Sequence, residues 1–162
     1  MERYRILDHM ADGKFRAFGV TIEEAFGNAA LACVSLMWGW EKVERRVEFP
    51  VEVRGRDREQ LLYRFLEEIL YLLDTRRFLL GSVEDLRIVE EESLAGDNSS
   101  STPGMIDEAA EILPAYRLTA RFRGDDEPAR YEFHGAVKAV TYNEMKIERG
   151  CGPWVVQVVV DM

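Results

Sequence analysis

The chain has 162 residues, 47% of them hydrophobic, which is enough apolar material for the core of one domain. Its net charge of −9, from 30 acidic and 21 basic residues, argues against direct binding of nucleic acid through phosphate contacts. The sequence holds no apolar run near the roughly 20 residues of a membrane helix and no signal-peptide pattern at its start. We therefore expect a single cytoplasmic domain over residues 1–162.

Cysteine usage agrees with a reducing compartment. Cys33 falls within an apolar helical pattern, and Cys151 lies in a turn between two glycines. The sequence gives no grounds for a disulfide between them. Two isolated cysteines and two distant histidines also lack the ligand spacing of a zinc site.

Two short strands are predicted at the N-terminus, around a loop that carries carboxylates. Tyr4 and Ile6 indicate the first strand, and residues 15–18 indicate the second. The loop between them includes Asp8 and Asp12.

The clearest helix signal follows this pair of strands. Thr21 and Glu24 form a capping box, and apolar residues recur at helical spacing as far as Met37. Gly39 is the expected stop.

A strand and a second helix come next in the chain. Residues 47–54 alternate between apolar and charged side chains, and Pro50 on the polar phase indicates an edge strand or a bulge. Asp57 and Gln60 mark the start of a helix whose broad apolar face extends to Leu73. Such a face must pack on another element, and a sheet is the expected partner.

The remaining segments are predicted to be strands, interrupted by one low-complexity insertion. One or two strands are expected within 78–91, and residues 92–113 form the insertion, which we expect to be mobile. Further strands are expected at 116–123, 131–134, 136–148 and 154–161. The last is almost wholly apolar and is expected to be central. The predicted fold class is α+β, with two helices on a mixed, mainly antiparallel sheet.

Four places could carry chemistry. Asp8 and Asp12 bracket His9 in the first loop, where oxygen ligands could converge on a hard cation, although a solvated turn has the same composition. Asp161 precedes Met162, which as a chain terminus would add a second carboxylate to a strand end.

The other two places are single charged residues. Asp74 at the end of the second helix opposes the helix dipole, or simply begins the next turn. Lys138 on a strand could be functional or could face water. The sequence has none of the phosphate-loop, nucleotide-binding, nucleophile-elbow or metalloprotease motifs, and no recognisable catalytic triad.

Together these segments resemble the archease family. The resemblance covers nearly the whole chain except 92–113. No single block of residues is decisive, but the occurrence of all the blocks in the same order along the chain is specific. It rests on six blocks: His9–Asp12, Ala17–Gly19, Thr21–Phe26, Leu66–Thr75, Val137–Tyr142 and Val158–Met162.

The resemblance implies an accessory protein and not an enzyme. Archeases assist the RtcB-type tRNA-splicing ligase, which joins RNA ends with GTP and divalent metal, and they promote its guanylation and repeated turnover. The ligase is the implied partner, with RNA reached only through it. The implied fold is a two-helix, mixed-sheet sandwich.

The implied site follows from the matched motifs. Asp12, Asp161 and a main-chain oxygen of Met162 would hold a divalent metal, with Ca²⁺ expected first and Mg²⁺ or Mn²⁺ as alternatives. His9, Lys138 and Asp74 would be further functional residues. Three departures affect the pattern: Met10 for the usual Thr, Asn143 where His is common, and Gly135-Ala136 where an acid is common.

Two other classes of function stay open from the residues. One is a small metal-dependent phosphohydrolase using Asp12, Asp74 and Asp161, against which the missing phosphate loop counts. The other is a chaperone-like protein-binding module, which would need an exposed apolar patch. Carboxylates and a metal supply no nucleophile, which favours a helper that positions charge at another protein's active site.

Overall fold

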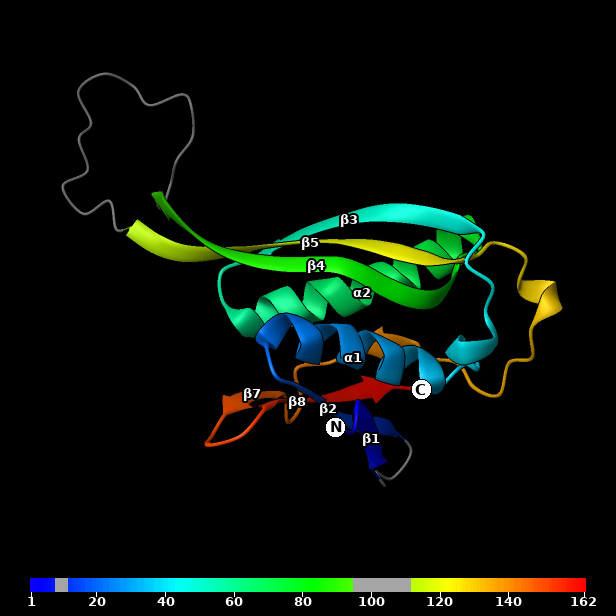
Figure 1. Cartoon of the computed structure of the whole chain (residues 1–162), viewed down its shortest axis with the longest axis horizontal. Coiled ribbons are helices and arrows are strands. Elements are labelled where there is room, and N and C mark those ends of the chain that lie inside the picture. The colour runs from blue at the N-terminus through cyan, green and yellow to red at the C-terminus, as the bar shows by residue number, and fades with distance from the viewer. Residues whose placement is uncertain (8–11, 95–111) are drawn as a thin grey trace, which may run out of the picture.

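Two helices lie between two antiparallel sheets in the computed structural model, which describes residues 1–7, 12–94 and 112–162 (Figure 1). One sheet has the strand order β1-β2-β8-β6, with β7 also paired to β8, and the other has the order β3-β5-β4. The strands are β1 (Tyr4–Leu7), β2 (Asp12–Gly19), β3 (Val47–Gly55), β4 (Leu79–Leu94), β5 (Ile112–Asp125), β6 (Ala139–Val140), β7 (Lys146–Arg149) and β8 (Trp154–Asp161). The predicted α+β class is confirmed, with the strands divided between two sheets.

Strand β8 is the centre of the first sheet, as its apolar sequence predicts. It pairs with β2 along its whole length, from Gly19 opposite Trp154 to Asp12 opposite Asp161. On its other side it pairs with β6 and β7. Val156, Val158 and Val160 are fully buried beneath the helices, so residues of the opposite phase face away from the core.

Helix α1 (Ile22–Ser35) begins where the capping signal predicts. The Thr21 hydroxyl accepts a hydrogen bond from the backbone N–H of Glu24 at 3.1 Å. Much of the helix is buried because it packs on β2 and β8 on one side and on β4 on the other. The helix ends before Gly39, which instead precedes a short 3-10 turn at Trp40–Lys42.

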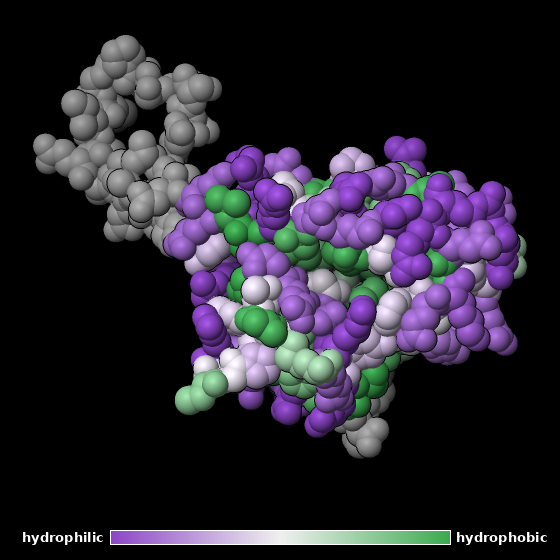
Figure 2. Space-filling model, viewed as in Figure 1, coloured by the Kyte–Doolittle hydropathy of each residue, from purple (hydrophilic) through white to green (hydrophobic). Residues whose placement is uncertain are grey.

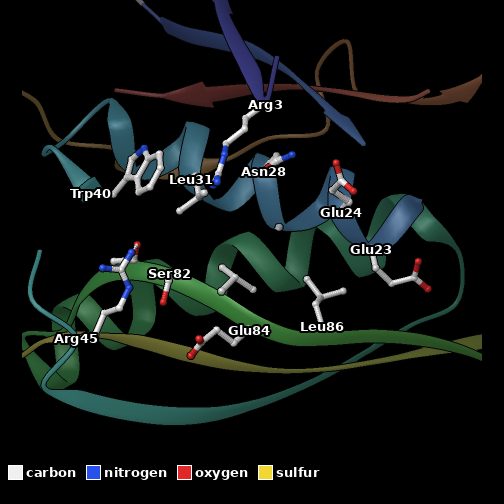
Figure 3. A pocket seen from close by; sticks show the side chains of 13 residues that line it. Arg3, Glu23, Glu24, Asn28, Leu31, Trp40, Arg45, Ser82, Glu84 and Leu86 are labelled. Atoms are coloured by element: carbon white, nitrogen blue, oxygen red, sulfur yellow. Dashed lines mark hydrogen bonds between the residues drawn. The ribbon is translucent and has the colours of Figure 1, made fainter. Parts of the chain in front are cut away.

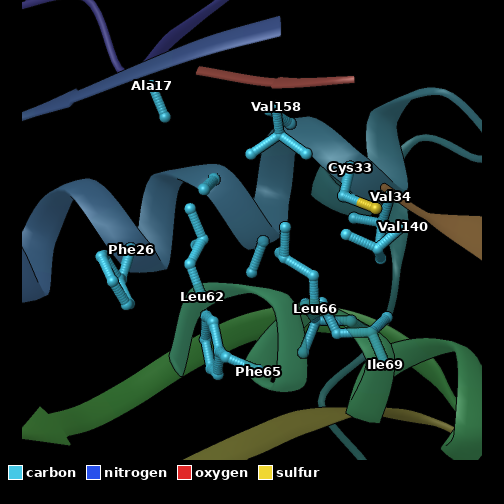
Figure 4. Close-up of a cluster of buried hydrophobic side chains, with 14 of the residues drawn as sticks. Ala17, Phe26, Cys33, Val34, Leu62, Phe65, Leu66, Ile69, Val140 and Val158 are labelled. Atoms are coloured by element: carbon cyan, nitrogen blue, oxygen red, sulfur yellow. The ribbon is translucent and has the colours of Figure 1, made fainter. Parts of the chain in front are cut away.

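Helix α2 (Arg58–Arg76) is capped by Asp57, whose Oδ1 accepts from the backbone N–H of Gln60 at 2.7 Å. Its apolar face enters the shared core, where Leu62, Phe65, Leu66 and Ile69 meet side chains of α1 and the first sheet (Figure 4). The helix ends at Arg77, which has a left-handed backbone with φ 53°. No helix in the described part of the chain is long and apolar enough to cross a membrane.

Strand β3 is an edge strand, as Pro50 predicts. The outer face of its sheet carries an arginine row on β5 flanked by acids on β3 and β4. Arg121, for example, pairs with Glu48 at 2.8 Å and with Asp85 at 2.5 Å. This face is therefore a solvated network of opposite charges, each pair contributing little on its own.

Two predicted strands are wrong or only partly right. Residues 131–134 form no strand and make only an isolated bridge between Trp38 and Phe133. The segment 136–148 is divided into β6 and the start of β7 by a turn in which the Met145 N–H bonds to the Tyr142 carbonyl and Glu144 has φ 53°. Alternating apolar residues cannot reveal such a turn when no glycine or proline marks it.

Strands β4 and β5 extend into the predicted insertion at 92–113 from both sides. Residues 78–91 give one strand, β4, with irregular pairing near Ser82 and Asp85. This strand continues to Leu94, and β5 begins at Ile112. The part of the predicted insertion at 95–111 lies outside the described residues.

Cys33 belongs to the core, as predicted. Its side chain is fully buried, and burial raises the pKa of its thiol to about 12. Cys151 is exposed, and neither cysteine is in a disulfide. Cys33 therefore stays a protonated apolar side chain at neutral pH.

Candidate functional site

Asp12 and Asp161 lie directly opposite each other at one end of the β2–β8 ladder. Directly opposed residues of an antiparallel pair point to the same face, with Cβ atoms about 4.5–5.5 Å apart. The neighbouring pair, Gly13 and Val160, points to the core, so both carboxylates point away from it. Asp161 is exposed and Asp12 is half-buried. The fold thus brings together two acids that are almost a whole chain apart.

A third segment reaches the same point through β6. Ala139 is the register partner of Asp161 on the side opposite to Asp12. The backbone N–H of Lys138 donates to the Asp161 carbonyl at 2.8 Å. The Lys138 side chain is exposed. Lys138 is therefore adjacent to the carboxylate pair through its main chain.

Met162 is anchored by its side chain, which packs against the core. Two glycines make room there, and a Cβ atom at Gly13 would lie 3.0 Å from the Met162 sulfur and 2.8 Å from Leu36 Cδ1. At Gly135, a Cβ atom would come within 2.4 Å of the Leu36 carbonyl oxygen and 3.3 Å of the Met162 methyl. A side chain at either glycine would therefore crowd Leu36 and the end of the Met162 side chain.

Gly13 and Gly135 are site-supporting residues that the sequence interpretation missed. Gly13 stands within a strand, beside a candidate ligand, and a glycine inside a strand often marks a close backbone approach. That signal was present in the sequence. Gly135 carried no such signal, because its close approach to Leu36 could not be inferred without the fold.

The other predicted site residues are placed differently. Asp74 is exposed in the last turn of α2, an element separate from the β2–β8–β6 corner. His9 and Asp8 lie outside the described residues. On the same outer face as Asp12, the structure adds Lys14, whose ammonium lies 3.3 Å from a carboxylate oxygen of Glu144.

The oxygen donors at this corner suit a hard cation. The carboxylates of Asp12 and Asp161 lie on one face, and a main-chain oxygen of Met162 is next along the chain. Oxygen atoms of these kinds are ligands that Ca²⁺, Mg²⁺ and Mn²⁺ accept. Within residues 1–7, 12–94 and 112–162, no three side chains of His, Cys, Asp or Glu gather closely enough to hold a metal by themselves. A cation here would therefore need further oxygen ligands from water or from a partner molecule.

The corner lies at the surface of the molecule, where Asp161 is exposed. A cavity of about 500 Å³ lies elsewhere, between α1 and β4, and its lining includes none of Asp12, Asp161 and Lys138. The exposed Asp161 side chain is therefore accessible to a large partner. The fold and this corner define a small α+β protein with a candidate cation site at one end of its first sheet.

Comparisons with known proteins identify the family. Residues 4–162 match the Archease protein family. The chain is 35% identical to the archease of Pyrococcus furiosus over 100% of both chains, and 34% identical to that of Methanosarcina mazei over 99% of this chain and 97% of the relative. The solution structure of Methanobacterium thermoautotrophicum protein 1598 is similar, with a TM-score of 0.71, 28% identity and full coverage of both chains. The chain therefore belongs to the archease family.

Proposed function

We propose that this archease activates an RNA ligase of the RtcB type in the cytoplasm, without being a catalyst itself. In this proposal the protein promotes the ligase's GTP-dependent guanylation and lets it turn over repeatedly. Family membership and the opposed pair of Asp12 and Asp161 support it. The pair is the observation that carries the proposal, because it offers charge on an exposed face where a partner can reach it.

A divalent metal would occupy this corner. Asp12, Asp161 and the main-chain oxygen of Met162 would hold it, and it would supply positive charge next to phosphate oxygens. Like charges directly opposite each other on a sheet are unfavourable. Two unit charges about 5 Å apart repel by roughly 1 kcal/mol in water and 3 kcal/mol at an effective dielectric of 20. A cation between the two carboxylates removes this repulsion, which favours binding.

The protein's own groups would keep the metal at the surface. The β2–β8 register sets both carboxylates on one face, and the Lys138 N–H fixes the backbone of Asp161 from the other side. The exposed Lys138 ammonium is available to the partner or to RNA phosphate held by the partner. The net charge of −9 suits docking to a basic RNA-binding cleft, with an association rate that salt would lower.

The test is a ligation time course with RNA in excess over ligase, in the presence and absence of this protein. Asp12→Asn and Asp161→Asn should each lose cation binding in calorimetric titrations with Ca²⁺, Mg²⁺ and Mn²⁺, and lose ligase activation. Glu148→Gln is the matched control, because Glu148 is an exposed acid of the same sheet away from the pair. Lys138→Met should keep cation binding and lose part of the activation.

Three results would count against the proposal. Unchanged cation affinity in both Asp variants would exclude the shared site. Phosphate release or RNA turnover by the purified protein alone, lost in Asp12→Asn, would favour the phosphohydrolase alternative. Unchanged ligation kinetics with wild-type protein would exclude activation of the ligase tested.

A further inference from the structure

A cavity of about 500 Å³ lies between α1 and β4, apart from the carboxylate pair. Figure 2 shows the molecular surface hollowed in this region, with hydrophilic side chains around it. Its volume is within the range of sites that bind small molecules. Leu31 and Leu86 supply apolar wall from α1 and from β4, and Trp40 adds an aromatic ring.

One end of this cavity is cationic. Arg3 and Arg45 enter it from opposite sides at the end where Trp40 lies (Figure 3). The Arg3 guanidinium sits 5.5 Å from the centroid of the Trp40 ring, and the Trp40 indole N–H donates to the Tyr4 hydroxyl at 2.9 Å. Arg45 donates one bond, to the Gly81 carbonyl at 3.3 Å. Both side chains are thus held near the cavity.

The ion pairs of the described residues occupy neither guanidinium group of the cavity. Among the ion pairs of the described residues, neither Arg3 nor Arg45 has a carboxylate within 4.0 Å. The acid of β4 that lines the cavity, Glu84, is paired with Arg123 at 3.4 Å. Arginines that do have carboxylate partners are Arg5, Arg46, Arg54, Arg117, Arg121, Arg123 and Arg130. Because only seven of the chain's 17 arginines have such a partner among the described residues, what sets Arg3 and Arg45 apart is that both line one cavity, where they are suited to an external anion.

The other end of the cavity is acidic. Glu23 and Glu24 lie in the first turn of α1, and Figure 3 shows them at the end away from Trp40. From Glu24 to Leu31 the helix rises by roughly 10 Å. A molecule that reaches from the arginines to these acids would therefore match the cavity with an anionic group at one end and a hydrogen-bond donor at the other.

A peptide strand added to the edge of β4 fits these contacts less well. The Trp38 indole N–H already bonds to the Leu80 carbonyl at 3.0 Å, and Arg45 bonds to the next carbonyl, that of Gly81. Asp85, with φ 52°, interrupts the regular strand further on. An incoming strand needs such carbonyls and a regular edge.

We propose that the cavity between α1 and β4 binds a small organic anion. Its phosphate or carboxylate group lies between Arg3 and Arg45, its body packs along Leu31 and Leu86, and an amino group approaches Glu23 and Glu24. This site is separate from the carboxylate pair, and the proposal does not depend on ligase activation.

The experiment uses the full-length protein and follows the indole N–H signals of its three tryptophans by NMR. The probes are AMP, which has a phosphate and an exocyclic amine, 6-aminohexanoate, which has a carboxylate and an amine, and the single-ended ions inorganic phosphate and acetate. We expect a saturable shift of the Trp40 signal with a two-ended probe, while Trp154, which does not line the cavity, stays unchanged. If AMP binds more tightly, the group recognised is a phosphate. If 6-aminohexanoate binds more tightly, the group recognised is a carboxylate.

Arg3→Gln and Arg45→Gln should each weaken binding about tenfold, the effect of losing one charged hydrogen-bonding partner. Arg87→Gln is the matched control, since Arg87 is an exposed arginine of β4 outside the cavity lining. Melting temperatures near that of wild type show that the variants fold. Unchanged binding in both cavity variants would overturn the proposal. The lack of a saturable shift with every probe at about 10 mM would also overturn it, because this concentration is above the dissociation constants of weak specific complexes. Equal affinity for single-ended and two-ended ions would contradict the role of Glu23 and Glu24.

Discussion

Replacing Tyr131 by Phe tests a buried polar contact that fastens the segment after β5. The Tyr131 hydroxyl donates to Asp125 Oδ2 at 2.6 Å and accepts from the backbone N–H of Glu44 at 3.0 Å. Asp125 has no exposed surface and also accepts from the Asp126 N–H at 2.8 Å. A hydrogen bond to a charged group contributes about 1.5–3 kcal/mol. We take the lower end, about 1.5–2 kcal/mol, because the contact lies beneath a surface loop.

The expected loss is measurable as a lower melting temperature. At about 2–4 °C per kcal/mol for a chain of this length, Tyr131→Phe should melt about 3–8 °C below wild type. Tyr63→Phe is the matched control, because the Tyr63 ring stacks on Tyr142 and its hydroxyl makes no hydrogen bond within the described part of the chain. Its melting temperature should change by less than that of Tyr131→Phe.

The pH dependence of the loss gives a second check. Burial alone would raise the pKa of Asp125, but hydrogen bonds from Tyr131 and from the Asp126 amide, with the charge of Arg46, hold it below its usual range. A carboxylate with a lowered pKa stabilises the fold above about pH 4 and loses that contribution as the pH falls further. The difference between wild type and Tyr131→Phe should therefore shrink below pH 4. An effect equal to that of Tyr63→Phe, or one independent of pH, would refute the assigned role.

Three further outcomes test the packing. Leu66→Ala should destabilise the protein by about 2–5 kcal/mol in urea unfolding, because Leu66 is fully buried between the helices and the sheets; a cost under 1 kcal/mol would mean that the core collapses into the space. Gly124→Ala should prevent normal folding, since the added Cβ would overlap the Leu79 carbonyl oxygen. Gly27→Ala is the contrasting variant, because its added Cβ would have no neighbouring atom within 4 Å, and it should be neutral or stabilise α1 by up to about 1 kcal/mol. Replacement of 95–111 by a short Gly-Ser turn should leave the melting temperature and ligase activation unchanged; a large drop in either would show that this segment contributes to the fold or to the site.

Local signals in the sequence were sufficient for the starts of both helices and for most of the strands. The caps at Thr21 and Asp57 are made by the side chains that predicted them, since capping depends on only a few neighbouring residues. Pro50 correctly marked an edge strand for the same reason. The division into two sheets was not predicted, because strand pairing joins segments such as β2 and β8 that are far apart in the chain.

The candidate site likewise depends on contacts between segments that are far apart in the chain. Asp12 and Asp161 were candidates from the residue pattern and from the family resemblance, and only the register of two distant strands shows that they are opposite each other. Gly13 and Gly135 were missed because their contacts involve Leu36 and Met162, which belong to other segments. The β6–β7 region was the least predictable, because its turn at Glu144 has a left-handed residue that is not glycine.

The alternation of side chains along β8 explains how Asp12 and Asp161 come to lie on one face of the sheet. Successive side chains of a strand point to opposite faces, so a slip of one residue would turn Asp161 to the core and Val160 to the surface. Burial of Val160 and of the Met162 side chain opposes that slip on both sides of Asp161. Gly13 allows this packing by leaving space for Met162. The apolar contacts beneath the sheet thus hold two like charges opposite each other above it, and the repulsion that results is what a bound cation would relieve.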